Sequence, residues 1–292
     1  MTMQAFLHQV MAGLASGAIY AAVALALVMI FKATHQVNFA QGELAVFSTY
    51  VALSLIQRGL PYGAALAISL VVSFLAGVAI ERVIMRPFKN APEVTSVIVF
   101  IGLLVSINGL AGWKFTSSIQ QFPSPFPDRA WYSSTYLSAH EAGTICVTLC
   151  VLGLVFAFFR FTRLGLAMRA AAENPRSSRL VGIRVGWMLA LGWGLAAALG
   201  AVAGAMAAPS LGLEPNMMAS VLLYAFAAAL LGGIDNPWGA PIGGFLVGVF
   251  INLAGAYAVG EQLKLPLALA VIVGVLLFKP SGLFGRTIVV RV

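Results

Sequence analysis

Charged residues are scarce in this sequence. Only 9% of the 292 residues are charged, whereas 61% are hydrophobic and the mean hydropathy is +0.96. A soluble domain carries about 25% charged residues, which cover its surface in water. The composition therefore excludes a soluble fold, and nucleic-acid binding is excluded with it. The net charge of +8 needs another explanation, which the positions of the basic residues supply.

Cysteine and histidine are also rare. The two cysteines, Cys146 and Cys150, lie four residues apart in an apolar run, and we expect buried, inert thiols rather than a disulfide framework. The three histidines are too widely spaced to suggest a metal site. No G-x-x-x-x-G-K-[ST] segment occurs, so we expect no ATP hydrolysis by this chain and no cofactor of its own.

Long apolar runs dominate what remains. A helix needs about 20 apolar residues to cross a bilayer, and eight stretches meet or approach that length: residues 10–31, 59–80, 94–113, 142–159, 185–213, 215–234, 236–260 and 265–278. A ninth stretch, 44–56, is shorter and either crosses or is re-entrant. We predict an all-α polytopic membrane protein: one transmembrane domain, 1–292, with about eight or nine helices, some of them broken or re-entrant.

The basic residues predict the orientation of this bundle. Thirteen of the 17 are Lys32 or members of clusters in 82–89, 160–184 and 279–291, and the other four fall on the opposite side. Because cytoplasmic loops carry the excess of Lys and Arg, we expect the clusters and the C-terminus to be cytoplasmic. The N-terminus is then external if 44–56 crosses, and cytoplasmic if it does not. The proline-containing loop 116–139 is expected to be external and extended.

Glycines are frequent and regularly spaced. Four pairs lie four residues apart, a spacing that lets helices approach closely in lipid: Gly13 and Gly17, Gly200 and Gly204, Gly239 and Gly243, and Gly244 and Gly248. Gly232 and Gly233 can end one helix before Asn236 and Pro237 begin the next. Broken helices often mark the pathway of a transporter, so these two glycines are candidate path residues. A solvated cytoplasmic turn around Asp235 is the simpler alternative.

Residues 34–43 form a polar island between two apolar stretches. Asn38 and Gln41 offer amide donors and acceptors, and Gly42 permits close backbone approach. Glu43 begins an apolar stretch, where an ionisable group is costly unless it faces a cavity or a partner. Two interpretations stand. In the first, the island is a cytoplasmic turn with Asn38 as a helix cap. In the second, four of its residues, Asn38, Gln41, Gly42 and Glu43, lie beside a translocation path or gate.

The basic segment 160–184 predicts a short helix–turn–helix. Residues 164–173 are strong helix formers, Asn174 can cap a second helix that starts at Pro175, and Gly182 can end it. The segment is too short and too basic to cross the membrane. It either rests on anionic lipid or docks a cytoplasmic protein.

This segment resembles the ATPase-coupling loop of branched-chain amino acid ABC transporter permeases, T-x-x-G-x-A-M-R-A-x-A-x-N followed by G-I. The matching residues are Thr162, Gly165, Ala167, Met168, Arg169, Ala170, Ala172, Asn174, Gly182 and Ile183. Residues 13–21 with 38–43 resemble the N-terminal signature of the LivH type, 231–233 with 239–244 the late glycine motif, and 279–285 the C-terminal ending. Gln41 departs from the family, which often has histidine there.

The resemblance implies the permease subunit of an ATP-driven, binding-protein-dependent importer in the bacterial inner membrane. Its solutes would be branched-chain or other hydrophobic amino acids, moved by alternating access. The implied partners are a second, LivM-like permease subunit, two cytoplasmic ABC ATPase subunits that bind the ATP, and a periplasmic solute-binding protein. The implied coupling residues are Arg163, Gly165, Met168, Arg169, Glu173, Asn174 and Gly182.

Three alternatives remain open. Sister importers for urea or short amides share these motifs. A stand-alone secondary transporter or channel would ordinarily need ionisable residues inside the membrane, and the glutamates here lie at predicted helix ends. An intramembrane enzyme would need a nucleophile–base pair or a metal set, and the sequence shows neither. We therefore predict a translocation subunit rather than an enzyme.

Overall fold

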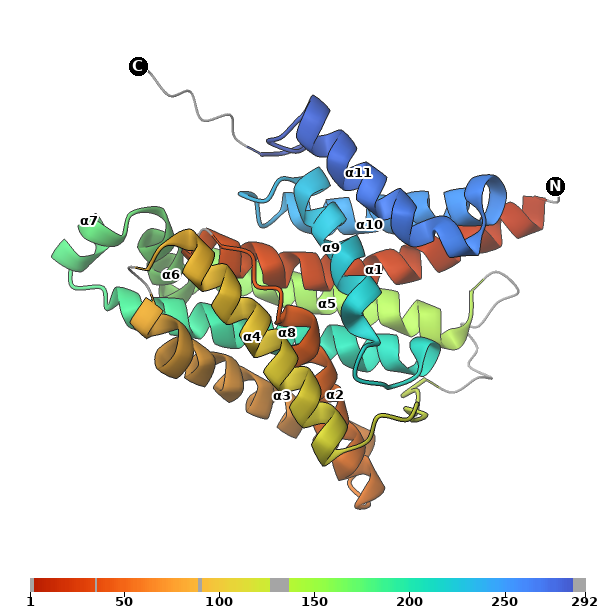
Figure 1. Ribbon diagram of the computed structural model, residues 1–292, viewed down its shortest axis with the longest axis horizontal. Helices are drawn as coiled ribbons and strands as arrows, with labels where there is room; N and C mark the ends of the chain where they lie inside the picture. Colours follow the sequence, from red (N-terminus) through yellow and green to blue (C-terminus); the bar gives the residue numbers. More distant parts are fainter. Residues whose placement is uncertain (1–2, 35, 89–90, 127–136, 286–292) are drawn as a thin grey trace.

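The computed structural model of the chain describes residues 3–34, 36–88, 91–126 and 137–285 (Figure 1). Within these ranges the chain is helical, and no strand occurs beyond an isolated bridge between Gln120 and Leu213. The helices are α1 (Met3–Thr34), α2 (Gln41–Gln57), α3 (Tyr62–Ala79) with its extensions η1 (Ile80–Met85) and η2 (Arg86–Phe88), α4 (Glu93–Lys114), α5 (Ala139–Phe161), α6 (Arg163–Glu173), α7 (Pro175–Leu180), α8 (Val185–Leu211), α9 (Met218–Gly232), α10 (Gly239–Ala254), η3 (Gly255–Val259), η4 (Glu261–Leu263) and α11 (Lys264–Phe278). The predicted all-α fold is confirmed.

Seven helices among the described residues are long and apolar enough to cross a membrane. They are α1, α3 with its extensions, α4, α5, α8, α10 with η3, and η4 with α11. The remaining predicted crossing, 215–234, is shorter than expected because α9 begins only at Met218, after a turn, and has 15 residues. The doubtful stretch 44–56 lies in α2, which has 17 residues and is mostly buried.

The helices α6 and α7 lie at one end of the bundle, where α3 ends and α8 begins (Figure 1). The first residues of α1 lie at the other end. The end of α1 joins the α6 side, because Lys32 forms an ion pair with Glu173 at 3.7 Å. The basic clusters at the end of α3 and in α6 and α7 therefore lie at the same end as Lys32. Three members of the set predicted to be cytoplasmic, Lys89, Arg286 and Arg291, lie outside the described residues, as do Arg129 and the rest of 127–136 from the loop predicted to be external.

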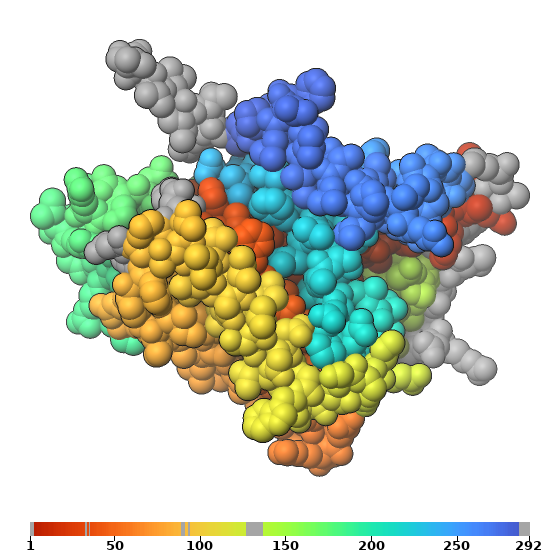
Figure 2. All heavy atoms as spheres, viewed as in Figure 1, coloured from red at the N-terminus to blue at the C-terminus, as the bar shows by residue number. Residues whose placement is uncertain are grey.

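Two helices occupy the centre of the bundle. The apolar spans of α1 and α8 are 72% and 78% buried, whereas the other five spans are 11–33% buried. In the space-filling view, α1 shows in gaps between the outer helices and at its N-terminal end, at the right edge (Figure 2). Both central helices are rich in alanine and glycine, and small side chains allow several neighbours to pack closely at once.

All four predicted glycine pairs pack between helices. On α1, a Cβ added to Gly13 would lie 2.8 Å from the Cα of Val249, and one on Gly17 would lie 2.9 Å from the Cα of Phe245, so α1 and α10 touch through their backbones. Gly244 and Gly248 form the other side of this contact. The two remaining pairs bring α8 against α2 and α10 against α9.

The prediction of buried thiols is wrong. Cys146 and Cys150 are both exposed on α5. Only 22% of the α5 span is buried inside the protein, so α5 is an outer helix that presents an apolar face outward. An apolar run does not distinguish a side chain packed in the core from one that faces lipid, because both environments exclude water.

Candidate functional site

The first helix of the predicted coupling segment, α6, begins at a cap that also ties it to α5. The Thr162 hydroxyl accepts a hydrogen bond from the Gly165 N–H at 2.9 Å and donates one to the Phe158 carbonyl at 2.7 Å. Gly165 is required by close approach, since a Cβ there would lie 2.6 Å from the Cα of Phe159. The start of α6 is therefore held firmly against the end of α5.

The remainder of α6 rests on α8 and reaches α1. Met168 and Ala171 are buried, and Ala171 packs with Val185 and Leu189 of α8. At the end of the helix, Glu173 pairs with Lys32 of α1. Contacts with three helices thus hold α6 in place, and two of those helices are the central ones.

The second helix of the predicted coupling segment, α7, is set by local signals that the sequence predicted correctly. The Asn174 side chain accepts a hydrogen bond from the Ser177 N–H at 3.0 Å, and Pro175 occupies the first turn. Gly182 follows with a φ of +83° and has open space around it. Its need for glycine is therefore conformational. The predicted helix–turn–helix is confirmed.

The exposed side of α6 and α7 is both basic and apolar. We call it the coupling surface, and its members are Arg163, Leu164, Leu166, Arg169, Arg176, Leu180 and Val181. Leu180 is 89% exposed and Val181 76% exposed. Large apolar side chains next to several cations are typical of a surface that binds another protein. The role of these residues in coupling stays a prediction.

In the polar island, residues 38–43 are buried inside the bundle except for Phe39, which is exposed. Asn38 and Gln41 are fully buried, and Gln41 Nε2 donates a hydrogen bond to the Ala196 carbonyl near the middle of α8, at 2.8 Å. The residue at the N-cap position of α2 is Ala40, and no side chain forms a capping hydrogen bond there. The prediction that Asn38 caps α2 is therefore wrong, and the placement of the turn on the cytoplasmic side stays a prediction. Irregular backbone at this depth is tolerated only inside protein or beside a cavity.

Two buried polar atoms of the island lack partners among the described residues. They are Asn38 Nδ2 and Gln41 Oε1. The Asn38 Oδ1 atom, in contrast, accepts the Ala40 N–H at 3.0 Å. Unsatisfied buried polar atoms are costly and are frequent at functional sites. This agrees with the path or gate interpretation, which stays a prediction.

Next to the island, an asparagine that sequence reasoning missed joins three segments. Asn108 Nδ2 on α4 lies 3.1 Å from Glu43 Oε2, 3.2 Å from the Pro215 carbonyl and 3.0 Å from Asn216 Oδ1. We call Glu43, Asn108, Pro215 and Asn216 the polar junction. Gly42 lies beside it, where a Cβ would be 3.4 Å from the Cβ of Met218. The available signal was an amide inside an apolar span, which usually has a function.

Gly232 and Gly233 lie elsewhere, at the end of α9 opposite Met218. Gly233 follows α9 with a φ of +105°. The turn is closed by the C-terminal motif, because the Leu283 N–H donates to the Leu231 carbonyl at 2.7 Å and Asn236 Nδ2 donates to the Phe284 carbonyl at 2.9 Å. The structure thus joins the late glycine motif to the C-terminal ending. Packing accounts for both glycines, and their place in a path stays a prediction.

This arrangement of motifs agrees with the comparison to known proteins. Residues 9–278 match the family described as the branched-chain amino acid transport system permease component. The chain belongs to this family. The permease is 31% identical to the high-affinity branched-chain amino acid transport system permease protein BraD of Pseudomonas aeruginosa, and 30% identical to LivH of Escherichia coli. Each comparison covers 98% of both chains.

Among solved structures, the permease is similar to PsaBC from Streptococcus pneumoniae, determined in complex with a Fab. The TM-score is 0.51 over 92% of this chain and 91% of the other, at 15% identity. At that identity the similarity shows the fold alone. The permease is therefore a multi-pass membrane protein of a transport family, as its motifs predicted.

Proposed function

We propose that this permease is the translocation subunit of an ATP-driven, binding-protein-dependent importer of branched-chain or other hydrophobic amino acids. The observation that carries the proposal is the coupling surface, where large apolar side chains and arginines are exposed on a firmly held pair of helices. The relatives support the solute class, because BraD and LivH are permeases of branched-chain amino acid transport systems. ATP is bound and hydrolysed by two ABC ATPase subunits that dock on this surface.

The contacts of α6 explain how a docked subunit would move the bundle. Thr162 ties α6 to α5, Met168 and Ala171 anchor it to α8, and the Glu173–Lys32 pair links it to α1. Since α1 and α8 are the central helices, displacement of α6 acts on the core directly. Such rocking of packed helices is the usual basis of alternating access.

The polar junction supplies a place for the solute. Glu43 and Asn216 offer oxygen atoms that suit an α-ammonium group, and the neighbouring face of α4 is apolar, with Ile101 and Val105 exposed. Asn216 is itself exposed. A second, LivM-like permease packed against this face would complete the path, and a periplasmic solute-binding protein would deliver the solute. In this arrangement α6, α7 and the C-terminus are cytoplasmic and the N-terminus is external.

The Arg169→Glu variant tests docking. In proteoliposomes with the two ATPase subunits and the binding protein, we expect ATP-driven uptake to fall at least tenfold while the variant still inserts and folds, because the reversed charge repels the docked subunit. The matched control is Arg58→Glu, an exposed arginine between α2 and α3, which should transport normally. Normal uptake by Arg169→Glu would exclude docking at α6.

Uptake competition identifies the solute. Labelled leucine is taken up in the presence of excess isoleucine, valine, urea or acetamide, and we expect only the amino acids to compete. Competition by urea or acetamide alone would assign the permease to an amide importer. Transport by the purified permease without ATPase subunits would instead show a stand-alone transporter.

A further inference from the structure

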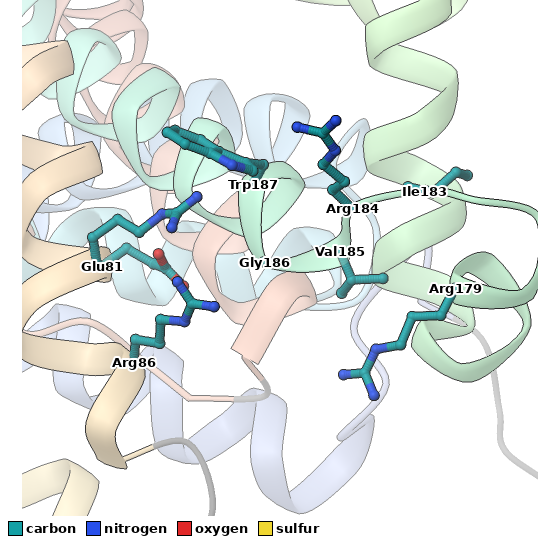
Figure 3. Close-up of a pocket in the computed structure, with 9 residues that line it drawn as sticks. Glu81, Arg86, Arg179, Ile183, Arg184, Val185, Gly186 and Trp187 are labelled. Carbon is teal, nitrogen blue, oxygen red and sulfur yellow. The ribbon is translucent and has the colours of Figure 1, made fainter.

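At the α6–α7 end of the bundle, a cleft of about 540 Å³ separates the end of α3 from the start of α8. It is lined by Glu81, Arg82, Arg86, Arg179, Ile183, Arg184, Val185, Gly186 and Trp187. Four arginines from three different segments meet one glutamate there. In Figure 3, Arg86 and Arg179 point into the cleft from opposite walls. An excess of guanidinium groups in one cleft favours an anion, and arginine binds phosphate in particular through two parallel hydrogen bonds.

The cleft is shaped by specific contacts. The Arg82 guanidinium lies over the Trp187 ring, 3.6 Å from its centre, and the buried Arg82 Nε has no hydrogen-bond partner among the described residues. Arg86 lies beside the first turn of α8, where a Cβ added to Gly186 would be in van der Waals contact with the nearer guanidinium nitrogen, at 3.8 Å. The amino end of α8 adds a partial positive charge. These features form a binding site for a phosphate group.

A second, mostly apolar groove of about 430 Å³ adjoins the cleft. It shares Ile183, Arg184 and Trp187 with the cleft, and its other members are Ala167, Gly182, Met188 and Leu191. A phosphate ion has no group that would occupy this groove. A ligand with a phosphate beside a hydrocarbon chain would fill both spaces, with Arg184 and Trp187 at their junction.

The position of the site agrees with such a ligand. The spans of α3 and α8 end here, and the surrounding surface is apolar, with Val83 73% exposed and Trp187 46% exposed. Tryptophan is frequent at the boundary between headgroups and hydrocarbon, and basic pockets between membrane helices bind anionic headgroups. We propose that the cleft and groove together bind one anionic phospholipid, its headgroup phosphate on Arg82, Arg86 and Arg179 and one acyl chain along α8.

The first experiment measures lipid binding to the purified permease in detergent by native mass spectrometry. Phosphatidylglycerol and phosphatidylcholine with the same acyl chains are compared. We expect phosphatidylglycerol to bind more tightly, and the double variant Arg86→Gln/Arg179→Gln to weaken its binding roughly 30-fold. The matched control, Arg160→Gln/Arg176→Gln, removes two exposed arginines of the same end outside the cleft and should bind within about twofold of wild type. Equal binding of both lipids, or unchanged binding by the cleft variant, overturns the proposal.

The second experiment needs no charge variant. Phosphatidylglycerol with brominated acyl chains should quench tryptophan fluorescence of the wild-type permease more than brominated phosphatidylcholine does, and Trp187→Phe should lose that difference. Inorganic phosphate at millimolar concentration should leave the quenching unchanged. Full displacement by phosphate would assign the site to the free anion. That result overturns the lipid assignment and leaves the transport proposal standing.

Discussion

The two polar segments of this permease are built by opposite means. In α6 and α7, the capping side chains of Thr162 and Asn174 bind backbone groups three residues away. In the polar island, Gln41 binds a carbonyl 155 residues away and Glu43 binds an amide 65 residues away. The first segment is largely exposed, apart from the side of α6 that packs on α8, whereas residues 38–43 of the island are buried except for Phe39.

The difference between local and long-range hydrogen bonds suggests which segment stabilises the bundle and which is available to bind a partner. A segment with local caps keeps its conformation on the surface and is free to bind a partner. A segment with distant hydrogen bonds keeps its conformation only while α4 and α8 surround it. We therefore expect changes in the island to destabilise the whole bundle, and changes in α7 to act locally.

The largest effect is expected where α2 meets α8. A Cβ on Gly204 would lie 2.8 Å from the Ala45 carbonyl oxygen, so Gly204→Leu must push α2 away. We expect a loss of about 3 kcal/mol in the free energy of unfolding, at the upper end for overpacked cores. Unfolding in detergent measures it. Gly153→Leu, with no atom within 4 Å of the added Cβ, should be tolerated, and equal stability of both variants would contradict this packing.

A smaller loss is expected for Gln41→Leu. The change removes the hydrogen bond to the Ala196 carbonyl from a fully buried site, at a cost of about 1.5 kcal/mol. The same substitution at Gln57, an exposed residue at the end of α2, is the control and should change little. If the two variants melt at the same temperature, the island is not held by this bond.

Local weakening is expected for Asn174→Ala. Loss of the cap should destabilise α7 by about 1 kcal/mol and leave global unfolding unchanged, because α7 is short and exposed. Hydrogen–deuterium exchange should accelerate in residues 175–182 only. Ser177→Ala keeps the N–H that Asn174 binds and should exchange at the wild-type rate. Faster exchange throughout α8 would show that the two regions are not separable.

The smallest effect is expected for Lys32→Gln. The pair with Glu173 is 3.7 Å long, and its side chains are 37% and 65% exposed, so it should contribute about 0.5 kcal/mol or less. The difference from wild type, measured by thermal unfolding, should vanish in 0.5 M salt. Lys114→Gln, at the end of α4, serves as the charge control. If Lys32→Gln lowers the free energy of unfolding as much as Gln41→Leu does, the Lys32–Glu173 ion pair is stronger than its exposure predicts.

Predictions from the sequence were correct where a feature depends on neighbouring residues, and they failed where it depends on distant parts of the chain. Capping at Asn174 and the glycine after α9 were predictable, since each depends on neighbours within a few residues. The exposure of Cys146 and Cys150 was not, because lipid and protein interior select the same apolar residues. Asn108 was missed for a related reason: its three partners come from other segments.

Composition and local spacing were sufficient for the helical membrane fold, the apolar runs and the two short helices α6 and α7, because insertion into lipid and helix capping act on nearby residues. The family was predicted from the resemblance of the motifs to those of known permeases. Tertiary packing decided which helices are central, that α2 begins inside the bundle, and that Arg82, Arg86 and Arg179 share one cleft. These features depend on contacts between distant parts of the chain. Apolar runs do not specify such contacts, since hydrophobicity drives a helix into the bilayer without selecting its neighbours.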